Sequence, residues 1–191
     1  MLMSPARGAR YETITHWVND RGWKKGAELG IFDGRTHLYL LANCPGLELI
    51  GVDVWDLPGF REGPSKSGEK CFCDWCNETR AARRAETVAQ MRKRVIRETA
   101  IYKGRSVILQ MTTAEAAGQV EDASLDFVFV DGDHSTEGVS ADVTNWRPKL
   151  KVGGMMIGHD WNLRSVREGV AQHFESQQIV LGQDHLWFAP C

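Results

Sequence analysis

The chain has 191 residues, a hydrophobic fraction of 42% and a formal net charge of −2 at pH 7. These values are typical of a single globular domain, residues 1–191, and they argue against a general attraction to nucleic acid or to a membrane surface. Apolar runs stay well short of the ~20 residues that a membrane helix needs, and the first residues lack the apolar core of a signal peptide. We therefore expect a cytoplasmic protein.

Hydrophobic patterning predicts strands that alternate with helices along the chain. The expected strands cover residues 24–29, 48–54, 107–110, 125–130, 152–158, 179–181 and 185–188. The expected helices cover residues 12–21, 36–42, 78–100, 113–118, 136–146 and 165–174. This alternation indicates an α/β fold with a doubly wound, mostly parallel sheet, which binds ligands at the carboxyl edge of its strands.

The first expected strand ends in the pattern Glu-x-Gly-x-x-x-Gly, formed by Glu28, Gly30 and Gly34. Glycines let the backbone turn sharply and approach a ligand closely, although an ordinary tight turn would explain them too. Asp53 ends the second strand, where a carboxylate can accept hydrogen bonds from both hydroxyls of a ribose. Asp33 would repel a pyrophosphate and attract an ammonium, so the turn favours a nucleoside with an amino-acid tail over a dinucleotide.

Two later strands each end in residues that can bind a metal. Asp131 follows the fourth strand, with His134 three residues later, and His159 and Asp160 follow the fifth. A helix-length segment between the two strands predicts a crossover that places both tips at one edge of the sheet. The carboxylates suit Mg²⁺, whereas the imidazole of His159 suits Zn, Mn, Fe or Ni better. His134 is the candidate general base because histidine titrates near neutrality. Helix capping by Asp131 and a structural role for His159 are the alternatives.

These motifs resemble those of class I S-adenosylmethionine-dependent methyltransferases. The first motif is similar to AELGIFDGRTHLYLL, and the strand with the ribose-binding acid is similar to GVDVWD. One branch of the family contains macrolide-sugar and small-molecule O-methyltransferases with a DGxH motif. This chain resembles that branch in the segment FVFVDGDHSTEGVSADVTNWRPKLKVGGMMIGHDW. The resemblance covers roughly residues 20–175 and implies a seven-stranded sheet with an antiparallel last strand.

The resemblance also implies the site residues. Residues that would bind S-adenosylmethionine are Glu28, Gly30, Ile31, Gly34, Asp53, Val54, Thr112 and Asp131. Thr112 or Thr113 would lie near the adenine, where many relatives carry an acid that this chain lacks. Residues with catalytic roles would be His134, Asp131 and Asp160, and an active-site Mg or Mn would be held by Asp131, His159 and Asp160. The chain departs from the family pattern after the fifth strand. Relatives often carry two adjacent acids there, or an acid and an amide, whereas this chain has His159 and Asp160.

An insert at residues 57–78 contains Cys71, Cys73 and Cys76 in the pattern C-x-C-x-x-C. Three thiolates and one more ligand suit a structural tetrahedral Zn²⁺, and the alternative is three reduced cysteines in a loop. Residues 61–105 hold 12 Lys and Arg against 6 Asp and Glu. This excess indicates an anionic acceptor or, more simply, a solvated helix face.

The leading hypothesis is an O-methyltransferase of a small, sugar-like or anionic acceptor, with His134 as general base and with Asp131 and Asp160 orienting the acceptor or a metal. Relatives of this type often form homodimers. One alternative is a hydroxylase-like enzyme on the same fold. Another is a zinc-containing module that binds nucleic acid or a protein partner, against which the complete cofactor loop argues.

Overall fold

The computed structural model describes residues 9–55 and 88–191. These residues form a seven-stranded sheet in the order β3-β2-β1-β4-β5-β7-β6. The strands are β1 (Lys25–Leu29), β2 (Glu48–Val52), β3 (Ser106–Leu109), β4 (Leu125–Val130), β5 (Leu150–Gly158), β6 (Val180–Leu181) and β7 (Trp187–Pro190). β7 is antiparallel to both of its neighbours, and the remaining pairs are parallel. The predicted fold, a doubly wound and mostly parallel sheet with an antiparallel last strand, is confirmed.

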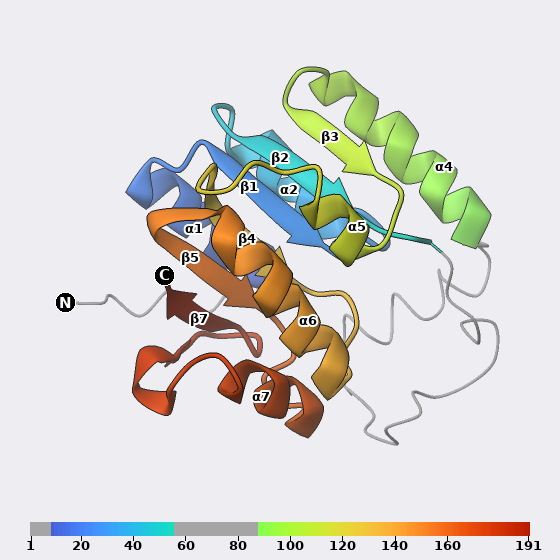
Figure 1. The fold of residues 1–191 in the computed structure, drawn as a ribbon. Coiled ribbons are helices and arrows are strands. Elements are labelled where there is room, and N and C mark those ends of the chain that lie inside the picture. The colour runs from blue at the N-terminus through green and yellow to red at the C-terminus, as the bar shows by residue number, and fades with distance from the viewer. Residues whose placement is uncertain (1–8, 56–87) are drawn as a thin grey trace.

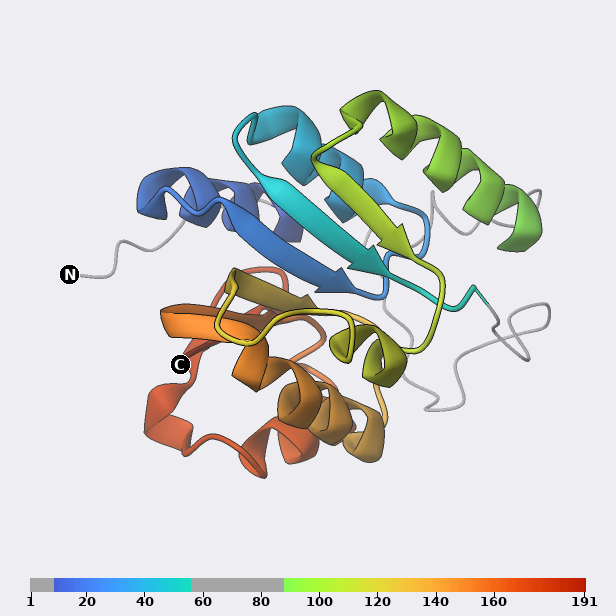
Figure 2. The same cartoon turned by 45° about the horizontal axis from the view of Figure 1, so that its top comes forward.

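Helices cover both faces of the sheet (Figure 1, Figure 2). One face carries α1 (Arg10–Arg21), α2 (Arg35–Asn43) and α4 (Val88–Thr99). The other face carries α5 (Thr113–Ala117), α6 (Thr136–Trp146) and α7 (Arg164–Ala171). Within residues 9–55 and 88–191, no helix has the length and apolar character that crossing a membrane requires.

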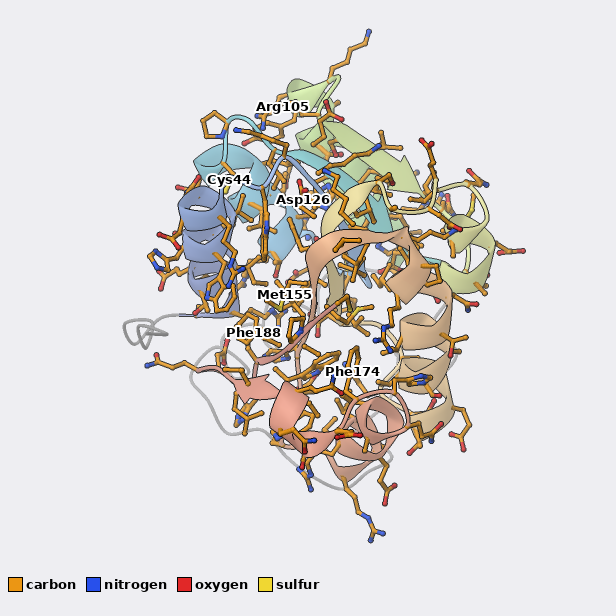
Figure 3. The ribbon with its side chains drawn as sticks, turned by 60° about the vertical axis from the view of Figure 1, so that its left-hand side comes forward. Cys44, Arg105, Asp126, Met155, Phe174 and Phe188 are labelled. Carbon is orange, nitrogen blue, oxygen red and sulfur yellow. The ribbon has the colours of Figure 1, made fainter. Side chains whose placement is uncertain are left out.

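The two large apolar clusters of the core lie one on each face of the sheet, because successive side chains of a strand point to opposite faces. A smaller third cluster contains Ile31, Trp55 and Val95. In β4, Phe127 and Phe129 join the cluster under α1 and α2, whereas Val128 and Val130 join the cluster under α6 and α7. Met155 and Phe188, labelled in Figure 3, belong to the α1 side. The middle strands are therefore buried on both faces, which leaves their carboxyl ends as the place where polar groups can gather.

Capping residues define the N-termini of α5 and α6. Thr112 caps α5, and its side chain exchanges hydrogen bonds with Glu115 in a capping box. Ser135 caps α6, where its hydroxyl accepts a hydrogen bond from the Gly138 N–H at 3.0 Å. Both caps satisfy N–H groups that the first turn of a helix leaves without partners.

Some expected boundaries differ from the structure by a few residues. β7 begins at Trp187 rather than at residue 185, because Asp184 and His185 have φ values of 52° and 56° and cannot extend a strand. α7 ends at Ala171, three residues before its expected end. Residues 56–87 lie outside the described part, and with them the insert at 57–78, its three cysteines and the start of the expected helix 78–100. The zinc site stays a prediction.

Candidate active site

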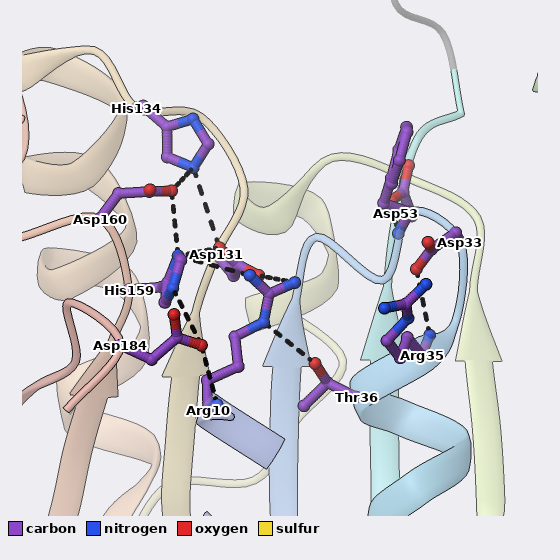
Figure 4. Close-up of polar contacts among 11 residues, drawn as sticks. Arg10, Asp33, Arg35, Thr36, Asp53, Asp131, His134, His159, Asp160 and Asp184 are labelled. Atoms are coloured by element: carbon purple, nitrogen blue, oxygen red, sulfur yellow. Dashed lines mark hydrogen bonds and ion pairs between the residues drawn. The ribbon is translucent and has the colours of Figure 1, made fainter. Parts of the chain in front are cut away.

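The pairing of β4 with β5 brings the two predicted strand tips together. Val130 is in register with Gly158, and the His159 N–H donates to the Val130 carbonyl at 3.1 Å. Asp131 and His159 therefore start their loops side by side at the carboxyl edge of the sheet (Figure 4). Asp160 has a φ of 57°, a left-handed conformation that turns the chain immediately after the strand.

Two carboxylates and two imidazoles converge at this edge. His134 Nε2 lies 2.9 Å from Asp160 Oδ2 and 3.9 Å from Asp131 Oδ1. His159 Nδ1 lies 3.2 Å from the same Asp160 oxygen and 3.6 Å from the same Asp131 oxygen. Each histidine thus lies within 3.9 Å of both carboxylates, and these four residues are the ones that the sequence predicted as catalytic or metal-binding groups at these tips.

The charges of this cluster are coupled. Burial disfavours the charged form of His134, but Asp131 and Asp160 outweigh burial and raise its pKa to about 10. Burial would raise the pKa of Asp160, but hydrogen bonds and ion pairing with His134 and His159 lower it instead. His134 is therefore an imidazolium at neutral pH in this arrangement. It can accept a proton only after another cation has taken over the charge of the carboxylates.

The same groups form a plausible metal-binding set by their chemistry. Asp131, His134 and Asp160 each offer one ligand atom, and these atoms lie within 4.8 Å of one another. Two carboxylate oxygens with one or two imidazole nitrogens suit Mn, Fe or Zn better than Mg, which prefers oxygen ligands alone. The donor set fits the predicted divalent ion, with Mn the better match of the two named from the sequence.

Arg10, at the start of α1, is a member of the site that the sequence analysis missed. Its guanidinium lies 3.3 Å from Asp131 Oδ2, donates to Thr36 Oγ1 at 3.3 Å and approaches His159 Nδ1 at 3.4 Å. Its backbone N–H donates to Asp184 Oδ2 at 2.9 Å. Arg10 therefore ties α1 to the tips of β4 and β5 and to the first turn of α2 (Figure 4).

The glycine turn after β1, which contains Gly30 and Gly34, packs closely against Asp131, the residue directly after β4. Gly30 has a φ of 89°, and a Cβ atom there would overlap the carbonyl oxygen of Asp131. Gly34 has a φ of 78° and is the N-cap of α2. Both positions need glycine for the backbone path alone. Close packing of this turn against Asp131 places the expected cofactor loop directly beside the cluster of Asp131, His134, His159 and Asp160.

Asp53 is fixed by the loop that it faces. Its carboxylate accepts hydrogen bonds from the Phe32 N–H at 2.7 Å and the Trp55 N–H at 2.6 Å. Burial raises the pKa of Asp53, and these two hydrogen bonds act against that rise. A carboxylate has about four acceptor positions, so each oxygen keeps capacity for a ribose hydroxyl. The residues present therefore fit the nucleoside half of the expected cofactor.

The remaining predicted cofactor residues have different surroundings. Glu28 is 1% exposed and pairs with His37 in the interior, while Ile31 is 3% exposed. Val54 is 36% exposed, beside Asp53. Thr112 uses its hydroxyl to cap α5. Their contacts with a cofactor stay predictions, and the structure gives Glu28 and Thr112 partners within the chain.

Residues 27–161 match a family described as a methyltransferase domain. The chain belongs to this methyltransferase family. The matched region begins in β1 and ends just after Asp160, so it includes both the glycine turn and the two strand tips.

Among curated proteins, the methyltransferase is 37% identical over 81 residues to the uncharacterised protein y4gI of Sinorhizobium fredii. The aligned segment covers 42% of this chain and 9% of y4gI. The chain thus spans less than a tenth of that relative's length, and y4gI supplies no argument about activity.

Solved structures share the fold of this methyltransferase. The S-adenosylhomocysteine-bound methyltransferase PaMTH1 of Podospora anserina superimposes with a TM-score of 0.63 at 13% identity, over 94% of this chain and 76% of that one. An O-methyltransferase of Bacillus cereus in complex with S-adenosylhomocysteine gives a TM-score of 0.61 at 12% identity, over 98% of this chain and 84% of that one. Identities this low establish the common fold.

Proposed function

We propose that this methyltransferase transfers the methyl group of S-adenosylmethionine to a hydroxyl oxygen of a small, sugar-like or anionic acceptor. The observation that carries the proposal is the convergence of Asp131, His134 and Asp160 next to the glycine turn after β1. A cofactor loop and a set of acid–base groups at one sheet edge are what a methyl transfer to oxygen requires.

The cofactor half rests on Gly30, Gly34 and Asp53. The two glycines leave the turn free of side chains, and Asp53 is held in place by two backbone N–H groups. Support for an S-adenosyl cofactor also comes from the fold shared with proteins crystallised with S-adenosylhomocysteine. When bound, the cofactor would supply an activated methyl group on a sulfonium.

The acceptor half rests on His134 and the two carboxylates. The acceptor oxygen attacks the methyl carbon, the bond from that carbon to sulfur breaks, and the hydroxyl proton must leave the oxygen. We assign that proton to His134, whose side chain is 44% exposed and therefore open to an acceptor. Asp131 and Asp160 would orient the acceptor, either directly or through a divalent ion that lowers the pKa of its hydroxyl.

The charge state of His134 favours the version with a divalent ion. Without another cation, Asp131 and Asp160 raise the pKa of His134 to about 10, so the imidazole already carries the proton that a general base would have to accept. A divalent ion held by the carboxylates would neutralise their charge and lower that pKa toward the range in which a base works. Mn²⁺ is the ion that we expect to serve best.

Support for an anionic acceptor comes from the basic residues of α4. Its described part carries Arg92, Lys93, Arg94 and Arg97. Arg94 donates a hydrogen bond to the carbonyl oxygen of Asp33 at 3.2 Å, so this helix reaches the glycine turn. A negatively charged acceptor would be attracted to that side of the site.

The proposal is tested by replacing His134 with Gln and measuring cofactor affinity and turnover separately. We expect methyl transfer to fall by about 10²–10⁴-fold, the usual contribution of a general base, while the affinity for S-adenosylmethionine stays nearly unchanged. His173→Gln, in the turn after α7, is the matched control, and it should keep normal turnover. Loss of cofactor affinity in His134→Gln would contradict the assigned role.

A further inference from the structure

Directly under the glycine turn lies a buried pair of titratable side chains, Glu28 of β1 and His37 of α2. Glu28 is 1% exposed and His37 is fully buried. Glu28 Oε2 and His37 Nδ1 are 3.0 Å apart, and His37 Nε2 lies 3.0 Å from Ser106 Oγ. Both ring nitrogens therefore have a partner inside the protein, and the candidate active site described above uses neither of them.

The position of the imidazole is fixed by Gly51 of β2. Gly51 is in register with Glu28, and a Cβ atom at Gly51 would lie 2.8 Å from His37 Cε1. The ring thus occupies space that any other residue at position 51 would fill, and it spans from β1 to β3. This close contact restricts the ring on one side, and transfer of a proton between Glu28 and His37 requires no movement of either side chain.

The pair is held in an uncharged state. Burial lowers the pKa of His37 to about 3. Burial also raises the pKa of Glu28 well above its usual value, and the negative charges of Asp131, Asp33 and Asp53 add to the rise while Arg10 opposes it. Both shifts favour the arrangement in which Glu28 donates its proton to His37 Nδ1 and His37 Nε2–H donates to Ser106 Oγ.

The acidic residues that add to the rise in the pKa of Glu28 surround the expected cofactor site. Asp53 and Asp33 belong to the loops expected to face the nucleoside, and Asp131 directly follows β4. S-Adenosylmethionine carries a positive sulfonium, whereas its product, S-adenosylhomocysteine, carries a neutral thioether. A positive charge among these carboxylates offsets their repulsion of a negative charge on Glu28.

We propose that Glu28 and His37 exchange one proton according to the charge of the bound cofactor, an inference that rests on the proposed function. When the sulfonium is present, the O–H bond of Glu28 breaks and an N–H bond forms at His37 Nδ1. The carboxylate and the imidazolium remain hydrogen-bonded, and Nε2–H still donates to Ser106. No proton enters from solvent, and the net charge of the pair stays zero. After transfer of the methyl group, the proton returns to Glu28.

This arrangement makes His37 a positioning residue that acts through Glu28. A carboxylate that forms only beside a sulfonium stabilises the substrate form of the cofactor more than the product form. The pair would therefore favour binding of S-adenosylmethionine and release of S-adenosylhomocysteine. A purely structural hydrogen bond between the same two groups would hold one protonation state throughout.

The decisive experiment records ¹⁵N NMR of the His37 ring in the full chain, alone and saturated with each of the two cofactor forms. We expect a neutral ring, with one pyridine-type nitrogen, in the free protein and with S-adenosylhomocysteine. We expect two protonated nitrogens with S-adenosylmethionine. The same protonation state in all three samples would overturn the inference.

Calorimetry on the same samples separates this inference from the proposed function. Saturable binding of both cofactor forms with an unchanging His37 refutes the proton exchange alone, whereas absence of binding refutes the proposed function and the inference with it. Glu28→Gln keeps the shape of the side chain but cannot supply the proton. It should reduce the preference for S-adenosylmethionine over S-adenosylhomocysteine by about tenfold, equivalent to one pKa unit of differential interaction. Glu168→Gln, the same change on the exposed surface of α7, should leave that preference intact.

Discussion

His134 Nε2 and Asp160 Oδ2 lie 2.9 Å apart, and this contact joins the loop after β4 to the tip of β5. The two residues come from separate strands, and both are held by backbone that the sheet fixes. The contact thus links the acid–base groups of the site to the pairing of β4 with β5. Its strength depends on the charge of the His134 imidazole.

This contact predicts a pH dependence of stability. Because the pKa of His134 is raised to about 10 from 6.5, the contact contributes stability that is complete below pH 6.5 and lost between pH 6.5 and about pH 10. The free energy of unfolding should therefore fall with rising pH across that window, and Asp160→Asn should reduce the slope. Urea unfolding of both proteins with a metal chelator present measures it. Identical slopes would contradict the coupling.

Gly30 and Gly104 allow backbone strain to be separated from close packing. Their φ values are 89° and 88°, but only a Cβ atom at Gly30 meets the backbone of Asp131, while Gly104 has nothing within 4 Å. Gly104→Ala should cost about 1–2 kcal/mol from the left-handed conformation alone. Gly30→Ala should cost more than about 3 kcal/mol because the tip of β4 must also move. Equal losses in urea unfolding would show that the approach of β1 to Asp131 is unimportant.

Arg10 should be required for turnover rather than for folding. Arg10→Lys keeps the charge but loses the planar fork that reaches Asp131, His159 and Thr36 together. We expect turnover to fall at least about tenfold, since a hydrogen bond to a charged group contributes about 1.5–3 kcal/mol. Arg21→Lys, at the other end of α1, is the control. Comparable effects of the two substitutions on turnover and on thermal unfolding would assign Arg10 to helix packing instead.

The strand tips should bind Mn²⁺ more tightly than Mg²⁺. The carboxylate oxygens of Asp131 and Asp160 and the imidazole nitrogen of His159 combine oxygen with nitrogen, which Mn²⁺ accepts and Mg²⁺ disfavours. Electron paramagnetic resonance of free Mn²⁺ in a titration measures the affinity, and competition with Mg²⁺ gives the preference. Asp160→Asn should weaken Mn²⁺ binding by about tenfold or more, the scale on which ligand-shell changes act. Unchanged binding in this variant would place the ion elsewhere.

The sequence was sufficient to predict the edge of the sheet and the groups on it. Apolar strands that end in Asp131 and in His159 and Asp160 had to be adjacent and parallel, because a helix-length crossover separates them. The glycine turn and Asp53 followed from their positions at the ends of β1 and β2. Each of these predictions depends on a local pattern joined to a general rule of α/β topology.

Contacts between distant segments could not be predicted in this way. Arg10 is 121 residues before Asp131, and the first turn of an amphipathic helix gives no sign of a partner there. The pattern that contains Glu28 predicts a cofactor contact, which stays a prediction, but it gives no sign of the buried contact with His37. The start of β7 was also misplaced, because the left-handed conformations of Asp184 and His185 arise in tertiary context rather than from residue type.

The central claim is that the loops after β1 and β2 bind S-adenosylmethionine, and a calorimetric titration tests it most directly. The wild-type chain should bind S-adenosylmethionine with micromolar affinity and one site per chain. Asp53→Ala should lose that binding while remaining folded, because the carboxylate that would hold the ribose is gone. A folded wild-type protein that binds no S-adenosylmethionine, or an Asp53→Ala variant that binds it as tightly as wild type, would contradict the account.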